Sequence, residues 1–209
     1  MAAALRHPNI VEILAILGEG PDVYIVSEFV PGKSVRAVIA EHGPLGFSEA
    51  RAVLRRVAHA LDYAHARGMF HGDLDAASVL IGEDGGVKVM DFSLALLAKE
   101  AASGGATPEA LSPGMAPEQR HGVMVRQADV YALAVCFYEM LCGRLPFAGR
   151  GTRRLERKLA GRHVPISRRV QGLPAALDEI FAKALDPEPD NRYPSAGKFL
   201  AAVELAELD

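Results

Sequence analysis

The stretch FHGDLDAASVLIGEDGGVKVMDFS, residues 70–93, decides the fold of this chain. Within it, two short apolar runs, 78–81 and 87–90, flank a Glu-Asp-Gly-Gly turn. A Gly-Gly turn between two β-type runs predicts a hairpin. The hairpin is expected to bring Asp73 and Asp91, which lie on either side of it, to the mouth of one cleft. Paired carboxylates at strand ends suit a divalent cation and a hydroxyl proton, the two requirements of phosphoryl transfer.

The motifs around these two acids resemble those of the protein kinase superfamily. Residues 71–78, His-Gly-Asp-Leu-Asp-Ala-Ala-Ser, match the catalytic loop H-R-D-L-x-x-x-N, and 91–93, Asp-Phe-Ser, match D-F-G. The set is most similar to bacterial Ser/Thr kinases of the Hanks type and covers nearly the whole chain. Further matches follow in the family's order: His-Pro-Asn-Ile-Val at 7–11, Ala-Pro-Glu at 116–118, Asp-Val-Tyr-Ala-Leu at 129–133, and Asp-Pro through Arg at 186–192.

This resemblance implies an α+β, protein-kinase-like fold. Residues 7–30 are expected to be a remnant strand pair and hinge of the small lobe, and residues 31–209 a mainly helical large lobe. Together they would form one domain over residues 1–209, a length that fits a single domain with a sizeable core.

The residue pattern itself predicts most of the elements. Alternation and turn residues favour strands, whereas apolar residues at helical spacing, with Ser34 as a cap and Gly68 as a stop, favour helices. The expected strands are 11–17 and 23–29, and the expected helices are 35–40, 48–65, 129–141 and two within 173–208, on either side of 186–189.

Composition excludes several classes of protein. Half of the residues are hydrophobic and the net charge is −3, so we expect neither a nucleic-acid binder nor a disordered chain. No segment reaches the roughly 18 apolar residues of a membrane span, and the N-terminus lacks the pattern of a secretion signal. Cys136 and Cys142 lie two turns apart in one predicted helix, so no disulfide is expected between them. We expect a cytoplasmic protein without membrane contact.

The resemblance assigns roles to residues of the cleft. Asp73 matches the catalytic base that accepts the proton of the substrate hydroxyl. Asp91 matches the primary magnesium ligand, and Ser78 takes the position of the asparagine that holds the second metal ion. The main chain at Glu28 and Val30 matches the hinge that holds adenine, with Leu80 beneath the ring.

Other matched residues are expected to support the scaffold. His71 should pack beneath Phe92, and Asp129 should hold the backbone of the catalytic loop from below. Glu118 and Arg192 match the buried ion pair that fixes the large lobe.

Several positions depart from the family's pattern. Gly72 replaces the arginine that pairs with a phosphate on the activation segment, and Asp75 replaces a lysine that neutralises the transferring phosphoryl group. Ser78 is a weaker metal ligand than asparagine, and Ser93 replaces the glycine of D-F-G. Leu111 replaces a threonine that bridges catalytic groups. The glycine at position 72 decides nothing alone, because some bacterial relatives tolerate it, but together these changes are expected to lower the rate of phosphoryl transfer.

Two functional hypotheses remain open from the sequence. The first is a pseudokinase that acts as a binding or regulatory module, with weak or absent binding of ATP and Mg²⁺. The alternative is an active Ser/Thr protein kinase that transfers the γ-phosphate of ATP to protein hydroxyls, with its N-terminal lobe outside this chain. No glycine-rich loop and no V-A-I-K-like lysine precede residue 7, so we expect the nucleotide to lack a roof here.

Two surfaces are expected to bind a protein partner or a second copy of the chain. The strand pair within 11–29 would have an unpaired edge and an uncovered apolar face. The region 150–169 carries eight basic residues opposed by Glu156 alone, although such a run is more often a solvated face.

Overall fold

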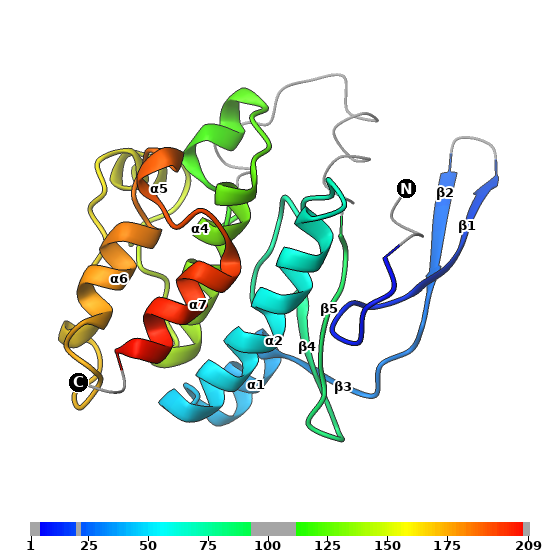
Figure 1. Cartoon of the computed structure of the whole chain (residues 1–209), viewed down its shortest axis with the longest axis horizontal. Helices are drawn as coiled ribbons and strands as arrows, with labels where there is room; N and C mark the ends of the chain where they lie inside the picture. Colours follow the sequence, from blue (N-terminus) through cyan, green and yellow to red (C-terminus); the bar gives the residue numbers. More distant parts are fainter. Residues whose placement is uncertain (1–4, 20–21, 93–111, 207–209) are drawn as a thin grey trace.

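The computed structural model describes residues 5–19, 22–92 and 112–206 (Figure 1). Its described helices pack together on one side, and two small antiparallel sheets lie toward the other (Figure 1). The strands are β1 (Ile13–Glu19), β2 (Asp22–Ser27), β3 (Gly32–Ser34), β4 (Val79–Gly82) and β5 (Val87–Val89). The α-helices are α1 (Val35–His42), α2 (Phe47–His65), α4 (Arg126–Cys142), α5 (Gly151–Leu159), α6 (Leu177–Ala184) and α7 (Ala196–Leu205). Short 3-10 turns occupy η3 (Pro117–His121), η4 (Ile166–Arg168) and η5 (Pro189–Asn191).

Helix α4 is the centre of the hydrophobic core, and α2, α6 and α7 pack around it. Phe137 of α4 is fully buried, with its ring centroid 5.7 Å from Phe181 of α6 and 6.2 Å from Phe199 of α7. Aromatic pairs at these separations stabilise beyond the area that they bury. The helix ends at Gly143, whose φ of 66° allows the left-handed turn that closes it.

The two hairpins expected from the sequence are confirmed. β1 and β2 pair antiparallel from Ile13–Ser27 to Glu19–Asp22, and β4 pairs antiparallel with β5. The short strand β3, which the sequence pattern did not indicate, adds to the outer edge of β4. These pairings place the end of β5, and with it Asp91, beside the loop that carries Asp73.

The expected helices are also present, with small differences at their ends. Ser34 caps α1 by accepting a hydrogen bond from the Ala37 amide at 3.2 Å. Helix α2 begins at Phe47 rather than Ser48, because the Glu49 side chain accepts from the Gly46 amide and fixes the first turn there. Cys136 and Cys142 are both free, as expected.

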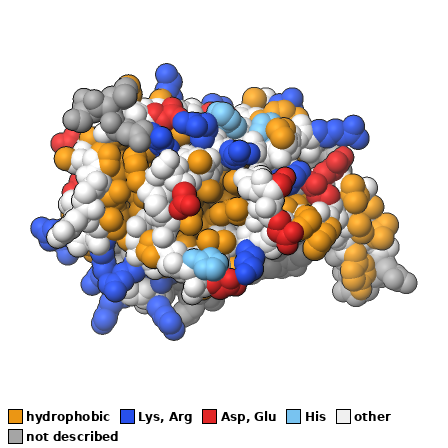
Figure 2. Space-filling view, turned by 90° about the horizontal axis from the view of Figure 1, so that it is seen from below, with side chains coloured by type: hydrophobic (Ala, Val, Ile, Leu, Met, Phe, Trp, Pro, Cys, Tyr) orange, Lys and Arg blue, Asp and Glu red, His pale blue; other side chains and the backbone are white. Residues whose placement is uncertain are grey.

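The β1–β2 hairpin stands apart from the helices (Figure 1) and exposes apolar side chains. Leu14 is 60% exposed and Tyr24 is 55% exposed, and Ile16, Leu17 and Val26 are exposed as well. Hydrophobic side chains accordingly gather at the hairpin end of the molecule in Figure 2. Among the described residues, β1 and β2 pair only with each other.

A buried ion pair joins η3 to the segment before α7. The Arg192 guanidinium donates to both carboxylate oxygens of Glu118, at 2.7 and 2.8 Å, and its side chain is fully buried. It also donates to the main-chain carbonyls of Gln127, Pro187 and Asp186. Such a pair is costly to break, because removal of one partner leaves a buried charge alone.

Lys158 is a buried member of the basic run 150–169, for which a solvated face is the more common interpretation. This lysine of α5 is only 3% exposed, and its ammonium group donates to the carbonyls of Pro113 at 2.8 Å and Met115 at 2.6 Å. Burial, followed by the nearby charge of Arg154, lowers the pKa of Lys158 to about 7. The lysine therefore fastens residues 113–115 to α5.

We expect Glu118→Ala to lower the free energy of unfolding by about 3–5 kcal/mol, because it strands the Arg192 charge in the interior. The matched control is Arg55→Ala, which breaks the exposed Arg55–Glu204 pair of 2.7 Å and should cost at most about 1 kcal/mol. Urea unfolding of both variants measures the difference. Equal losses in the two variants would contradict the structural role of the buried pair.

Lys158→Met should change how stability depends on pH. Between about pH 7 and the ordinary lysine pKa of 10.5, the unfolded chain binds a proton at this site that the folded chain does not. Lys158 therefore makes the free energy of unfolding rise with pH over that window, and the rise should be smaller in Lys158→Met. Urea midpoints measured from pH 6.5 to about 9 would show it, with the exposed Lys198→Met as the control. Parallel pH profiles for wild type and Lys158→Met would refute this assignment.

Candidate functional site

The loop that carries Asp73 is held from below by the carboxylate of Asp129. Asp129, on α4, is 1% exposed and accepts hydrogen bonds from the amides of His71 and Gly72, both at 2.8 Å. The same carboxylate lies 2.8 Å from the Nε2 atom of His65 at the end of α2. The two amide contacts join α4 directly to the loop, and the His65 contact joins α4 to α2.

His71 and Gly72 have structural roles in this loop. The ring of His71 lies 4.9 Å from the ring of Phe92, and its Nε2 atom is 2.9 Å from the Met90 carbonyl oxygen. The Asp73 amide donates to Nδ1 of the same histidine at 3.3 Å. Gly72 has a φ of 80°, a left-handed conformation that disfavours any larger residue. The side chain of Asp73 thus projects from a loop that is fixed on both sides.

Asp91 is the one described non-glycine residue with a positive φ, at 66°. Strained backbone of this kind tends to occur at functional sites. Burial raises the pKa of the Asp91 carboxyl, the charges of Asp73 and Asp75 raise it further, and His71 opposes the change. The charge of Asp73 therefore acts on Asp91, and the excess of carboxylate charge there favours a bound cation.

Asp75 is held by contacts that the sequence could not indicate. One carboxylate oxygen lies 2.8 Å from the Arg36 guanidinium of α1, and the other accepts from the Ala77 amide at 2.7 Å. Arg36 thus compensates the charge at a position where the family has a lysine. The substituted position contributes no net positive charge to the cleft.

Ser78 is largely engaged within the same loop. Its hydroxyl donates to the Asp75 carbonyl at 2.9 Å and accepts from the Asp75 amide at 3.1 Å, and the residue is 6% exposed. One lone pair of the hydroxyl remains for a metal ion. Within the described residues, no three His, Cys, Asp or Glu side chains gather so that they could hold a metal ion. Asp91 thus fits one divalent cation that takes its other ligands from phosphate and water.

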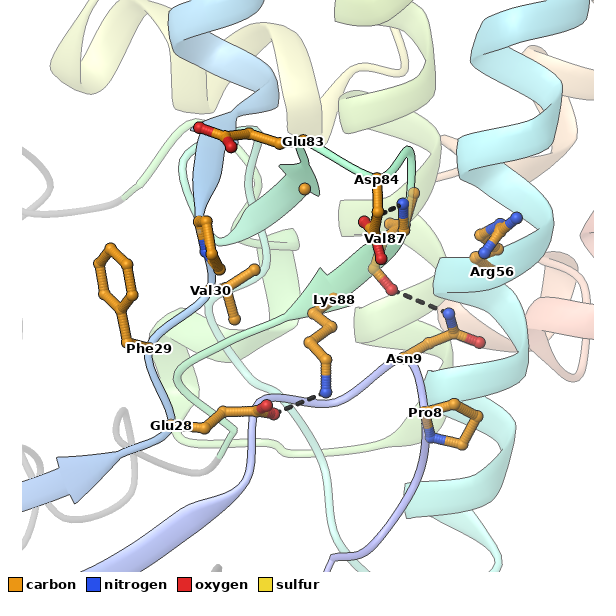
Figure 3. A pocket seen from close by; sticks show the side chains of 13 residues that line it. Pro8, Asn9, Glu28, Phe29, Val30, Arg56, Glu83, Asp84, Val87 and Lys88 are labelled. Atoms are coloured by element: carbon orange, nitrogen blue, oxygen red, sulfur yellow. Dashed lines mark hydrogen bonds and ion pairs between the residues drawn. The ribbon is translucent and has the colours of Figure 1, made fainter.

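The side chains of Glu28 and Val30 line a cavity of about 480 Å³ (Figure 3). Neither Asp73 nor Asp91 borders this cavity. Glu28 forms an ion pair of 2.6 Å with Lys88 of β5 in this wall (Figure 3), and it accepts from the Glu12 amide at 2.8 Å. The side chain of Glu28 therefore braces the junction between β2 and β5.

A second cavity, of about 310 Å³, borders Asp91 instead. It is lined by Asp91, Phe92 and Met90 on one side and by residues of the β1–β2 hairpin on the other. Ser27, at the end of β2, contributes to its wall. Leu80 lines neither cavity; it is half-buried on β4, where it pairs with Ser34 and Lys88 across the sheet.

Two residues that sequence reasoning missed fix the segment after the activation region. Gln119 is buried, and its side-chain amide donates to the Gly72 carbonyl at 2.7 Å while its oxygen accepts from the Ala116 amide at 2.7 Å. Gly114 approaches the Leu74 carbonyl so closely that a Cβ atom would clash with it. In the sequence, the glutamine directly after Ala-Pro-Glu could have indicated the contact between Gln119 and Gly72. Ser93 and Leu111, named above as departures, lie outside the described residues.

Comparison with known proteins identifies the family. A family model for the protein kinase domain matches residues 1–201. The Ser/Thr-protein kinase PknB of Mycobacterium leprae is 34% identical over 212 residues, covering 96% of this chain and 33% of that protein. PknB of Mycobacterium tuberculosis is 35% identical over 213 residues, with the same coverage. A probable PknB of Bifidobacterium longum is 34% identical and is covered over 31% of its length.

A solved structure gives the same answer for the fold. Rad53 1–466 in complex with AMP-PNP matches with a TM-score of 0.79 and 25% identity, over 95% of this chain and 51% of that chain. This likeness confirms the α+β, protein-kinase-like fold. The chain spans about one third of the length of the curated relatives it matches. In the described part of the chain, no helix combines the length and the apolar character of a membrane span. The sequence motifs, the anchored loop and these matches together show that the chain belongs to the protein kinase domain family.

Proposed function

We propose that this chain is a kinase-like binding or regulatory module with little or no phosphoryl-transfer activity. The observation that carries the proposal is Asp75, which stands where the family has a lysine and is held there by Arg36. Phosphoryl transfer depends on fixed positive charge beside the transferring group. In this loop the position supplies a carboxylate whose charge a guanidinium already compensates.

The metal position of the site supports the same proposal through Ser78. Burial and the charges of Asp73 and Asp75 raise the pKa of the Asp91 carboxyl, so Asp91 can hold one cation. Ser78 offers a single lone pair to a second metal ion. ATP and Mg²⁺ are accordingly proposed to bind weakly or not at all, with Asp91 as the primary ion ligand.

A second candidate is an active Ser/Thr protein kinase. It is favoured by the left-handed backbone of Asp91 and by the Asp129 contacts that hold Asp73 in place. Relatives named as Ser/Thr-protein kinases at about one-third identity agree with it. Under this candidate, Asp73 accepts the proton of a protein hydroxyl, while Asp91 binds the ion that bridges the phosphates of ATP.

Partners are proposed at the β1–β2 hairpin. Its apolar side chains are exposed over both strands, and contiguous apolar surface of this kind marks interaction sites. Either another protein or a second copy of the chain would bury it. The basic region 150–169 is the other proposed surface.

Wild-type protein should transfer phosphate from ATP to a Ser/Thr substrate no faster than Asp73→Asn. Asp190→Asn, which removes an exposed acid of η5, is the control for the change in charge. Incorporation of radiolabelled phosphate measures the rates. Steady transfer by wild type that Asp73→Asn abolishes would overturn the proposal in favour of the active kinase.

If the lost cation at position 75 limits transfer, the rate of phosphoryl transfer by Asp75→Lys should exceed that of Asp75→Asn at least tenfold. A tenfold difference in rate corresponds to about 1.4 kcal/mol in the barrier.

A thermal or urea unfolding series with MgATP tests the nucleotide site. A site with a Kd of about 10 µM raises the free energy of unfolding by about 2.7 kcal/mol at about 1 mM ATP, whereas a Kd near the ATP concentration raises it by about 0.4 kcal/mol. We expect the smaller gain, or none. Asp91→Asn is the control, because it removes the ion ligand and leaves the scaffold contacts. A gain of the larger size in wild type that is absent in Asp91→Asn would show a tight site and contradict the expectation.

A further inference from the structure

A small cavity lies between α5 and the segment that enters η3. Its lining residues are Ser112, Met115, Ala116, Gly151, Arg154, Leu155 and Lys158, hereafter the α5 pocket. The cavity has a volume of about 20 Å³, which holds about one water molecule. No assigned catalytic or nucleotide residue borders it.

Positive charge is concentrated along one face of α5. Arg150, Arg154 and Lys158 follow one another at four-residue spacing, which places them on one side of a helix. Burial and then the charge of Arg150 lower the pKa of Arg154, and Arg154 in turn lowers the pKa of Lys158. These like charges therefore lie close enough to repel one another.

Carboxylates relieve this repulsion only in part: Glu139 of α4 favours the charged form of Arg154. Among the described ion pairs, none involves Arg150, Arg154 or Lys158. Glu118, which favours the charged form of Lys158, gives both its oxygens to Arg192. Glu156, the acid of α5 itself, is exposed and lies out of step with the basic face. The face thus carries an excess of positive charge, mainly from Arg150 and Arg154, and part of it is buried.

Hydrogen-bond donors without acceptors converge on the same pocket. The Ser112 hydroxyl is buried and has no hydrogen-bond partner. Lys158 uses two of its three ammonium protons on the carbonyls of Pro113 and Met115. Arg154 uses Nε on the Gly149 carbonyl at 2.9 Å, which leaves its terminal nitrogens. The first amides of α5 also lack a capping side chain.

We propose that the α5 pocket binds a phosphomonoester carried by a serine or threonine of a partner polypeptide. A phosphate presents three strong acceptor oxygens, whereas a carboxylate presents two, and the pocket offers donors from the Arg154 guanidinium, the Lys158 amino group and the Ser112 hydroxyl. The cavity is smaller than a phosphate group, so the phosphate lies at its mouth with one oxygen inside the cavity. Arg154 makes the main contact there. This site does not depend on whether Asp73 is active.

Binding at this pocket acts on the segment that contacts the catalytic loop. Residues 112–116 are held to α5 by Lys158 and to Leu74 by the close approach of Gly114. Gln119 continues the connection to the Gly72 carbonyl. Gly72 has no guanidinium that could pair with a phosphate. Arg154 of α5 offers a guanidinium beside residues 112–116.

The test uses the peptide Gly-Gly-phosphoserine-Gly-Gly, titrated into the full chain and followed by amide chemical shifts. We expect saturable shifts around 112–116 and the start of α5. Arg154→Gln should weaken binding at least tenfold, and Arg153→Gln, its exposed neighbour of equal charge, should change it less than twofold. The same peptide with unmodified serine should not bind, and the peptide with glutamate should bind at least tenfold more weakly.

Several results would overturn the proposal. Absence of saturable shifts in wild type would remove the site. Equal weakening by Arg154→Gln and Arg153→Gln would show a diffuse response to charge, and equal affinity for the glutamate peptide would show a carboxylate site instead. Unchanged urea midpoints for both variants establish that a loss of binding does not come from unfolding.

Discussion

A carboxylate in the middle of the core is the constraint on which the rest of this structure depends. Asp129 is 1% exposed, and burial of an isolated charge is very costly unless hydrogen bonds compensate it. The amides of His71 and Gly72 supply that compensation, with His65 beside them. Because Asp129 comes from the central helix and the amides come from the loop, neither can move without leaving the charge unpaired. The position of Asp73 follows from this requirement.

This chain keeps the residues that support the fold, whereas it has changed residues at positions where the family's cations face a phosphate. The contacts of Asp129, Gln119 and the Glu118–Arg192 pair are all made. The changed positions, Gly72 and Asp75, are those where the family places cations. A domain can lose such cations without loss of stability, because their usual partners are phosphate groups rather than the core. The preserved fold is therefore compatible with an active kinase and with an inactive one.

Local pattern predicted much of the fold, because turns, caps and apolar periodicity act over a few residues. The β4–β5 hairpin and the end of α4 at Gly143 are examples. Contacts over long separations were not predictable in the same way. Arg36 meets Asp75 across 39 positions, and Lys158 is buried by residues 113–115, although it sits in a run that looks solvated. The motifs indicated the candidate site residues, whereas only the packing showed that Ser78 and Asp75 are already engaged.

The left-handed backbone at Gly72 has a consequence for substitutions at this position. Its amide and its carbonyl are both held, by Asp129 and Gln119, so its φ of 80° cannot relax. An arginine at this position would pay about 1–2 kcal/mol of steric strain. An ion pair between the guanidinium and a phosphate on the activation segment would offset that cost; without the phosphate, glycine is favoured. An arginine here would therefore strain the backbone at once, whereas any gain from it depends on a phosphate that pairs with the guanidinium.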